Sequence, residues 1–143
     1  MRTLWLLILA LFCTPDKMCD GAVEIDRHSF NNLLKAIATV ESNNDPNAYN
    51  ADENAAGLYQ IRPILLKDCN RILRKPRFKL ADRFDPVKSG YIASIYLGHY
   101  GAGKSIEQLA RIWNGGPLGY KKKSTKKYWE KVKKVMEALE NVR

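Results

Sequence analysis

The chain has 143 residues, which is enough for one domain with a single hydrophobic core and too few for two. Its 24 lysines and arginines outnumber its 15 aspartates and glutamates, which gives a net charge of +9. From Lys104 to Arg143 there are 11 basic and 4 acidic residues, so most of the excess lies in this segment. Such a segment favours anionic partners, although a solvated helix face also explains many lysine runs. The two histidines and three cysteines show no metal-ligand spacing, so we expect no metal site.

The N-terminus has the pattern of a secretory signal peptide. Arg2 supplies its positive end, and the ten-residue apolar run from Leu4 to Cys13 is too short to span a bilayer. We expect cleavage after Gly21, with an uncleaved anchor as the alternative. Residues 1–21 are then the leader and residues 22–143 the domain. We expect a secreted or periplasmic monomer without a stable membrane span and with no nucleic acid partner.

Cleavage after Gly21 removes two of the three cysteines and leaves Cys69 alone. Cys69 stands in an apolar segment, so we expect a buried, inert thiol. A Cys19–Cys69 disulfide would require earlier cleavage.

The first expected helix places an acid where an apolar residue belongs. Apolar residues recur at the three-and-four spacing of one helix face, and Glu41 is the next position on that face. The segment 42–46 (SNNDP) ends the helix directly afterwards. Burial and the negative helix end both disfavour the anion, so we predict a raised pKa for Glu41 and a role as general acid. The alternative is a solvated glutamate at a helix that ends one turn earlier. The apolar residues of the face are Phe30, Leu33, Leu34, Ile37 and Ala38.

The remaining elements are helices joined by short polar loops. The loop from Ser42 to Ala56 has room for at most a small β-hairpin. A second helix is expected from Pro63 to about Leu73, because proline favours the first helical position. Asp85-Pro86 combines a cap with such a proline and predicts the start of a third helix.

Two more helices complete the chain. Ser105 and Gln108 fit a capping box that begins a short helix through Ile112. The turn sequence at 114–117 (NGGP) ends it. The last helix, from about Ser124 to Val142, has one apolar face and one lysine-rich face. With no βαβ pattern, the predicted fold class is mainly α, with at most a small β-hairpin. The apolar face consists of Trp129, Val132, Met136 and Leu139.

Three short motifs occur in a fixed order along the chain. They are Glu41-Ser42, the segment 57–61 (GLYQI) and the segment 112–117 (IWNGGP), with Pro46-Asn47-Ala48 between the first two. Their order and spacing resemble those of the soluble lytic transglycosylase and goose-type lysozyme group of the lysozyme-like superfamily. The resemblance extends from about Ser29 to Tyr120, and it implies a lysozyme-like single domain.

The resemblance implies an enzyme that cleaves peptidoglycan at the β-1,4 bond between N-acetylmuramic acid and N-acetylglucosamine. Glu41 would protonate the glycosidic oxygen of this bond, and no cofactor is required. Anionic cell-wall polymers would be attracted by the basic C-terminal helix, mainly through Lys121, Lys122, Lys123, Lys126 and Lys127. The residues implied in substrate binding are Ser42, Gly57, Tyr59, Gln60, Trp113 and Asn114.

Gly57 would let the backbone approach the glycan, and Gln60 would hydrogen-bond the glycan or its N-acetyl groups. Asn114 would hold its turn against Glu41 or contact substrate. Tyr59 replaces the usual methionine, and the position of Trp113 often holds a tyrosine whose hydroxyl can bond the catalytic carboxyl. Core packing is an equally strong interpretation of Tyr59 and Trp113.

The reaction type depends on a second carboxylate. A lytic transglycosylase needs one acid, because the same glutamate later takes a proton from the muramyl 6-hydroxyl and leaves a 1,6-anhydro product. A hydrolase needs a second carboxylate. Asp45, Asp52 and Glu53 lie in the right loop, and the goose-type resemblance favours Asp52 or Glu53. The sequence leans toward the transglycosylase, with the lysozyme as the alternative.

A non-catalytic binding module is the rival interpretation. Such a module could bind nucleic acid or an anionic wall polymer. The aromatic residues would stack on the ligand and the surrounding lysines would contact its phosphates; these aromatic residues are Tyr120, Tyr128 and Trp129. A lysozyme-like protein that binds wall glycan without cutting it is a third. The binding module leaves the common occurrence of Glu41 and the other two motifs unexplained, and the retention of Glu41 argues against the non-cutting protein.

Overall fold

The computed structural model describes residues 25–142, and it is mainly α, as predicted. The expected leader, Cys13 and Cys19 lie outside the described residues. No helix within residues 25–142 has both the length and the apolar character needed to cross a membrane. The α-helices are α1 (Arg27–Ser42), α2 (Pro63–Ile72), α3 (Pro86–Tyr100), α4 (Ile106–Gly115) and α5 (Lys126–Asn141), with short 3₁₀ helices η1 (Leu80–Phe84), η2 (Gly119–Lys121) and η3 (Lys123–Thr125).

Helix α1 reaches far enough to carry Glu41 in its last turn. The Asp26 side chain caps its start by accepting the backbone N–H of Ser29 at 3.0 Å. Asn43 ends it in the left-handed conformation (φ 53°), and its N–H donates to the Thr39 carbonyl at 2.9 Å. The alternative of a helix that stops one turn earlier is therefore wrong.

Two other helix starts also follow their predicted caps. The Asp85 carboxylate accepts the backbone N–H of Val87 at 2.9 Å at the start of α3. Ser105 and Gln108 form the expected capping box of α4. Helix α4 continues beyond Ile112 to Gly115, because the chain leaves the helix only at Gly116, where φ is +82°.

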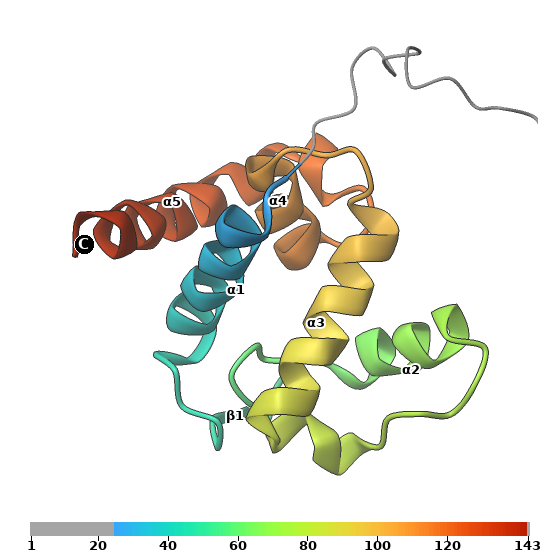
Figure 1. Ribbon diagram of the computed structural model, residues 1–143. Helices are drawn as coiled ribbons and strands as arrows, with labels where there is room; N and C mark the ends of the chain where they lie inside the picture. The colour runs from blue at the N-terminus through green and yellow to red at the C-terminus, as the bar shows by residue number, and fades with distance from the viewer. Residues whose placement is uncertain (1–24, 143) are drawn as a thin grey trace, which may run out of the picture.

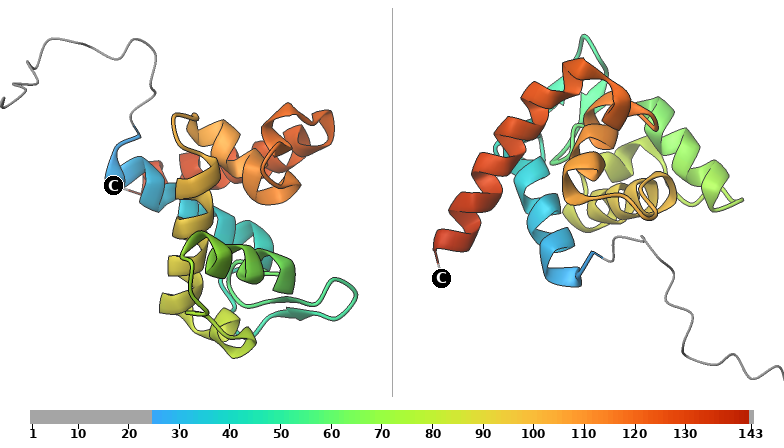
Figure 2. Two further views of the ribbon diagram at one scale, coloured as in Figure 1. Left: turned by 90° about the vertical axis from the view of Figure 1, so that its right-hand side faces the viewer. Right: turned by 90° about the horizontal axis from the view of Figure 1, so that it is seen from above.

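Helix α3 lies at the centre of the molecule, with α1 and α5 side by side on one flank, α2 on the other, and the hairpin at the bottom beyond the end of α1 (Figure 1; further views in Figure 2). Ile92 and Leu97 of α3 are fully buried, as are Leu33 and Ile37 of α1. Cys69 of α2 is a buried free thiol, and burial raises its pKa to about 12. The predicted burial of Cys69 is confirmed, and a raised thiol pKa disfavours the reactive thiolate.

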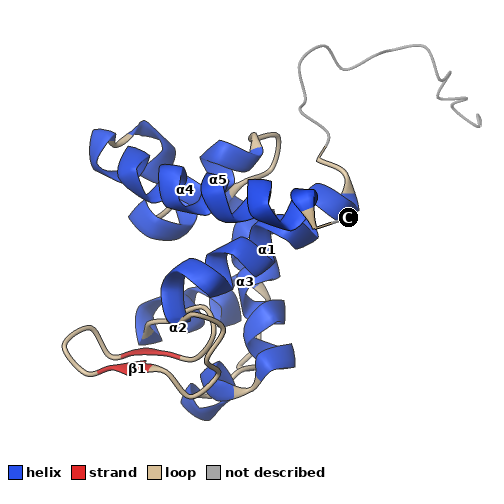
Figure 3. Ribbon diagram, turned by 90° about the vertical axis from the view of Figure 1, so that its left-hand side faces the viewer, coloured by secondary structure: helices blue, strands red, loops and turns tan. Residues whose placement is uncertain are grey.

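The expected small hairpin forms from β1 (Tyr49–Asn50) and β2 (Ala55–Ala56), which pair antiparallel and project from the helical body (Figure 3). The buried Arg83 side chain fixes its base. Nη1 of Arg83 donates to the carbonyls of Asn54 at 2.7 Å and Ile61 at 3.0 Å, and Nε donates to that of Leu80 at 2.9 Å. One side chain thus links the hairpin loop, Ile61, which forms an isolated bridge with Ala56 of β2, and η1.

Candidate active site

A cleft of about 990 Å³ runs between α2 with the hairpin loop on one side and the end of α4 with the η3 segment on the other. Glu41, at the end of α1, lines this cleft. The other cleft residues used below are Glu53, Gln60, Arg62, Lys67, Asp68, Arg71, Tyr96, Trp113, Asn114 and Lys122.

Glu41 is half-buried, and its pKa is raised, as predicted. Burial is the largest cause. Hydrogen bonds from the Tyr128 hydroxyl and the Trp113 side chain act in the opposite direction, as does the positive charge of Arg62. The Tyr128 hydroxyl donates to Oε1 of Glu41 at 2.7 Å. The net effect favours the protonated carboxyl, which is the form that a general acid needs.

Tyr128 is the site residue that sequence reasoning missed. It lies on α5 one turn before the fully buried Val132, so helical spacing places it on the buried face of that helix. Burial is the main cause of its raised pKa, and the charge of Glu41 adds to it, so the hydroxyl stays a donor. Tyr128 therefore faces the carboxyl and not a nucleic acid surface, and it supplies the tyrosine hydroxyl that the family pattern places at position 113.

Trp113 combines packing with a place in the site. Its ring stands edge-on to Tyr59, with centroids 6.1 Å apart, and to Tyr96 at 6.0 Å. Trp113 lines the cleft, whereas Tyr59 is buried beside Gly90 and is not among the cleft residues. The structure therefore favours core packing for Tyr59.

Ser42 and Gly57 support the site without lining the cleft. The Ser42 hydroxyl donates to the carbonyls of Leu58 at 2.9 Å and Ala38 at 3.1 Å, which joins the end of α1 to the loop carrying Gln60. Gly57 has φ +76°, and a Cβ there would lie 1.8 Å from the Arg83 carbonyl oxygen. The backbone that approaches Gly57 closely is thus the protein's own.

Gln60 and Asn114 both line the cleft, as expected. Nε2 of Gln60 donates to the carbonyls of Ala48 at 3.2 Å and Gly57 at 3.0 Å. The loop thereby fixes the amide and leaves its carbonyl oxygen as the acceptor for a ligand. Asn114 is exposed near the end of α4.

The three candidate second acids occupy different environments. Glu53 lines the cleft, and its carboxylate forms a hydrogen-bonded ion pair with Arg62. Asp52 is exposed and is not among the cleft residues. Asp45 accepts the backbone N–H of Asn47 at 2.9 Å and stabilises the turn after α1. Glu53 is the one of the three that the fold brings into the cleft with Glu41.

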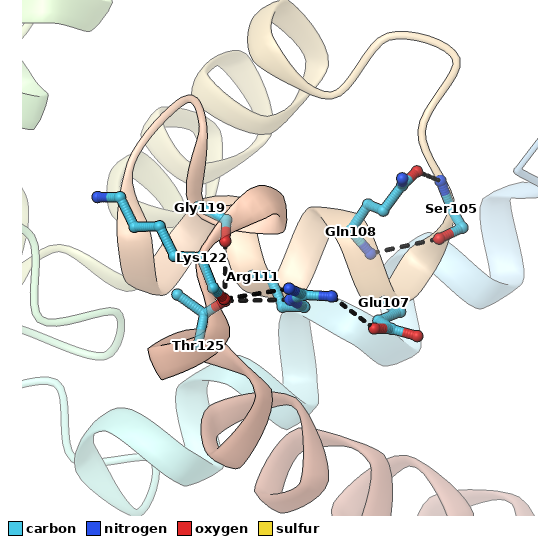
Figure 4. A network of polar contacts seen from close by, with 7 residues as sticks. All are labelled: Ser105, Glu107, Gln108, Arg111, Gly119, Lys122 and Thr125. Carbon is cyan, nitrogen blue, oxygen red and sulfur yellow. Dashed lines mark hydrogen bonds and ion pairs between the residues drawn. The ribbon is translucent and has the colours of Figure 1, made fainter.

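A buried arginine fixes the wall opposite the hairpin (Figure 4). Arg111 pairs with Glu107 at 2.8 Å and donates to the Thr125 hydroxyl at 3.0 Å and the Lys122 carbonyl at 3.1 Å. Thr125 in turn donates to the carbonyl of Gly119 at 2.8 Å. This network holds the chain just before α5, three residues ahead of Tyr128.

A small helical domain whose cleft contains a half-buried glutamate with a raised pKa is typical of glycosidases that cleave by carboxylic-acid catalysis. The chain belongs to the family described as Transglycosylase SLT domain, which matches residues 21–136. Over 106 residues it is 34% identical to a lysozyme of Magallana gigas, covering 69% of this chain and 74% of that protein.

A solved structure is also similar. The crystal structure of Aeromonas hydrophila PliI in complex with Meretrix lusoria lysozyme contains a chain that matches with a TM-score of 0.61 and 25% identity. The match covers 72% of this chain and 87% of that chain. The predicted lysozyme-like membership is confirmed, and the protein is a peptidoglycan-cleaving enzyme.

Proposed function

We propose that the protein is a lysozyme that hydrolyses the β-1,4 bond between N-acetylmuramic acid and N-acetylglucosamine. Glu41 acts as the general acid and Glu53 as the second carboxylate. The observation that carries this proposal is the presence of both carboxyl groups in one cleft, with Glu53 held by Arg62. A relative described as a lysozyme supports it, as does the similarity to a chain of a solved complex that contains a lysozyme.

Glu41 is set up to donate a proton and then to carry a charge. The Tyr128 hydroxyl donates to Oε1 of the carboxyl, and the Trp113 side chain donates to the same carboxyl group. Once the proton of Glu41 passes to the glycosidic oxygen, the carboxylate that remains is stabilised by Tyr128 and Trp113, whose hydrogen bonds favour the ionised form.

Glu53 supplies the second enzyme carboxylate that hydrolysis requires. This carboxylate either attacks the anomeric carbon of the sugar or activates the water that does so. Arg62 orients this carboxylate at the cleft wall. Asp52, the other candidate from the goose-type resemblance, has no such placement, so the proposal assigns it no role.

The second candidate is the lytic transglycosylase, which the family description favours. In that reaction Glu41, after donating its proton, takes one from the muramyl 6-hydroxyl. The muramyl residue then closes to a 1,6-anhydro ring, and Glu53 takes no part.

Mass spectrometry of digests of purified peptidoglycan distinguishes the two reactions. We expect reducing ends, one water heavier than anhydro ends, from the wild type. Glu41→Gln and Glu53→Gln should each lose activity by about 10²- to 10⁴-fold, the usual contribution of acid–base catalysis. The matched control Asp52→Asn removes the neighbouring exposed charge and should stay active. Anhydro ends from a fully active Glu53→Gln variant would establish the transglycosylase.

We also propose that residues 1–21 direct the protein out of the cytoplasm. Its wall substrate lies outside the membrane. The substrate class supports this assignment, since peptidoglycan is assembled outside the membrane. N-terminal sequencing of the protein released by the native host should begin at Ala22.

A further inference from the structure

A polar cluster lies on the α2 wall of the cleft, and the proposed mechanism does not use it. Asp68 and Arg71 of α2 both line the cleft, and Tyr100 ends α3. Oδ1 of Asp68 accepts Nε of Arg71 at 2.8 Å and Nη2 at 2.6 Å. The Tyr100 hydroxyl donates to Oδ2 of Asp68 and accepts Nη2 of Arg71 at 3.0 Å.

These contacts hold the Arg71 guanidinium in one orientation. Its Nε and Nη2 are engaged, whereas Nη1 makes no hydrogen bond to any described residue. The Arg71 side chain is 65% exposed and the Asp68 side chain 22%, so the carboxylate is covered while the guanidinium faces the cleft. A guanidinium fixed in this way is preorganised to bind a planar anion.

The charge of the cleft favours an anionic ligand. Its lining includes four basic side chains and three acidic ones. Glu41 is held toward its neutral form and Glu53 is paired with Arg62. Lys67 and Arg71 therefore leave the α2 wall positive, although Asp68 lies between them. A neutral glycan would gain nothing from this charge.

We propose that Arg71 is a specificity-determining residue that binds a carboxylate of the muramyl side of the substrate, with Asp68 and Tyr100 as its positioning residues. The carboxylate belongs either to the lactyl group of N-acetylmuramic acid or to the peptide stem attached to it. The inference rests on the proposed peptidoglycan substrate, but it holds for hydrolysis and transglycosylation alike.

Binding is the decisive measurement, because it does not depend on bond cleavage. In a Glu41→Gln background, calorimetry would compare three ligands. A chitooligosaccharide has no carboxylate, amidase-treated glycan strands keep the lactyl carboxylate, and untreated soluble strands carry the stem. Arg71→Gln should weaken binding of carboxylate-bearing strands about tenfold and leave the chitooligosaccharide unchanged. Arg74→Gln, an exposed arginine outside the cleft, is the matched control.

The pattern of losses identifies the carboxylate. A loss confined to amidase-treated strands points to the lactyl carboxylate, because the stem occupies this group as an amide in untreated strands. A loss confined to untreated strands points to a carboxylate of the stem, and a loss with both kinds of strand means that Arg71 accepts either one. Arg71→Lys, which keeps the charge without the planar fork, should restore only part of the affinity. An equal loss with all three ligands, or no loss with any, would overturn the inference, and thermal unfolding of each variant verifies its fold. Failure of the wild type to release reducing ends would reject the proposed hydrolysis and leave these binding results intact.

Discussion

The carboxyl of Glu41 experiences two opposing influences. Burial raises its pKa, while the hydroxyl of Tyr128 and the side chain of Trp113 lower it. Burial dominates, so the pKa of Glu41 lies above that of a free glutamate and the protonated form persists to higher pH. The two donors are in place for the anion that the reaction creates. Either influence alone would give a worse catalyst, because a general acid must hold its proton and also release it.

Removing the Tyr128 hydroxyl should therefore change the pH dependence of catalysis in a defined direction. Tyr128→Phe takes away a contact that favours the ionised carboxylate, so the pKa of Glu41 rises further. The basic limb of the pH–rate profile depends on protonated Glu41 and should move to higher pH. Activity at the optimum should fall about tenfold, because a hydrogen bond to a charged group is lost.

The matched control is Tyr120→Phe, whose hydroxyl makes no hydrogen bond with any described residue and whose ring instead faces Lys104 at 5.3 Å. Its pH profile should coincide with that of the wild type. A basic limb that moves to lower pH in Tyr128→Phe would contradict the role given to this hydroxyl.

Single residues were predictable where the signal was local. Glu41 stood out because an acid interrupts an apolar helix face within its own segment. The partner of Glu41 lies on another helix, 87 residues away, and only tertiary packing brings the two together. Helical spacing could place Tyr128 on the buried face of α5, but it could not show which residue lies opposite.

Among the elements, the hairpin loop depends on a contact that crosses the fold. It carries Glu53, and its base is fixed by the Arg83 side chain and by the close approach of the Arg83 carbonyl to Gly57. Gly57 meets two demands at once, a positive φ and a lack of space for a Cβ.

A pair of glycine substitutions separates these two demands. Gly103 also has a positive φ of +70°, but nothing lies within 4 Å of where its Cβ would be. Gly103→Ala should lower the free energy of unfolding by about 1 kcal/mol through backbone strain alone. Gly57→Ala adds the collision with Arg83 and should cost about 3 kcal/mol or more. Urea denaturation measures the free energy of unfolding of both variants. Equal losses of stability would show that the Arg83 carbonyl moves away from a Cβ at position 57 at little cost.

Helix boundaries could be predicted where caps and prolines lie next to each other in the chain. Asp85-Pro86 and the Ser105–Gln108 box mark their helices correctly. The end of α4 was placed too early, because Asn114 and Gly115 are typical of turns but still continue the helix here. Gly57 was expected to contact the glycan for a similar reason. Its neighbour in the fold, Arg83, is 26 residues away in the chain, so a local sequence pattern cannot reveal the contact.

At the scale of the whole molecule, the net charge of +9 should make encounter with anionic walls sensitive to salt. The kcat/KM for peptidoglycan should fall several-fold between about 0.05 and 0.5 M salt, over which the Debye length shrinks from beyond 10 Å to below 5 Å. Replacing the exposed Lys123, Lys126 and Lys127 by glutamine should flatten this dependence.

A neutral chitooligosaccharide provides the comparison, since its cleavage should vary little over the same range. Equal salt sensitivity for both substrates would mean that salt acts on the enzyme itself and not on the encounter with the wall.

The packing of α1 against α5 determines when catalytic activity can arise as the chain folds (Figure 1). The acid comes from the first described helix and its hydroxyl donor from the last, so the catalytic pair closes a loop that encompasses most of the domain. Closing so long a loop is entropically costly and requires the segments between to be in place. A chain whose final helix has not docked holds Glu41 without its partner, so full catalytic power requires α5 to be in place against α1.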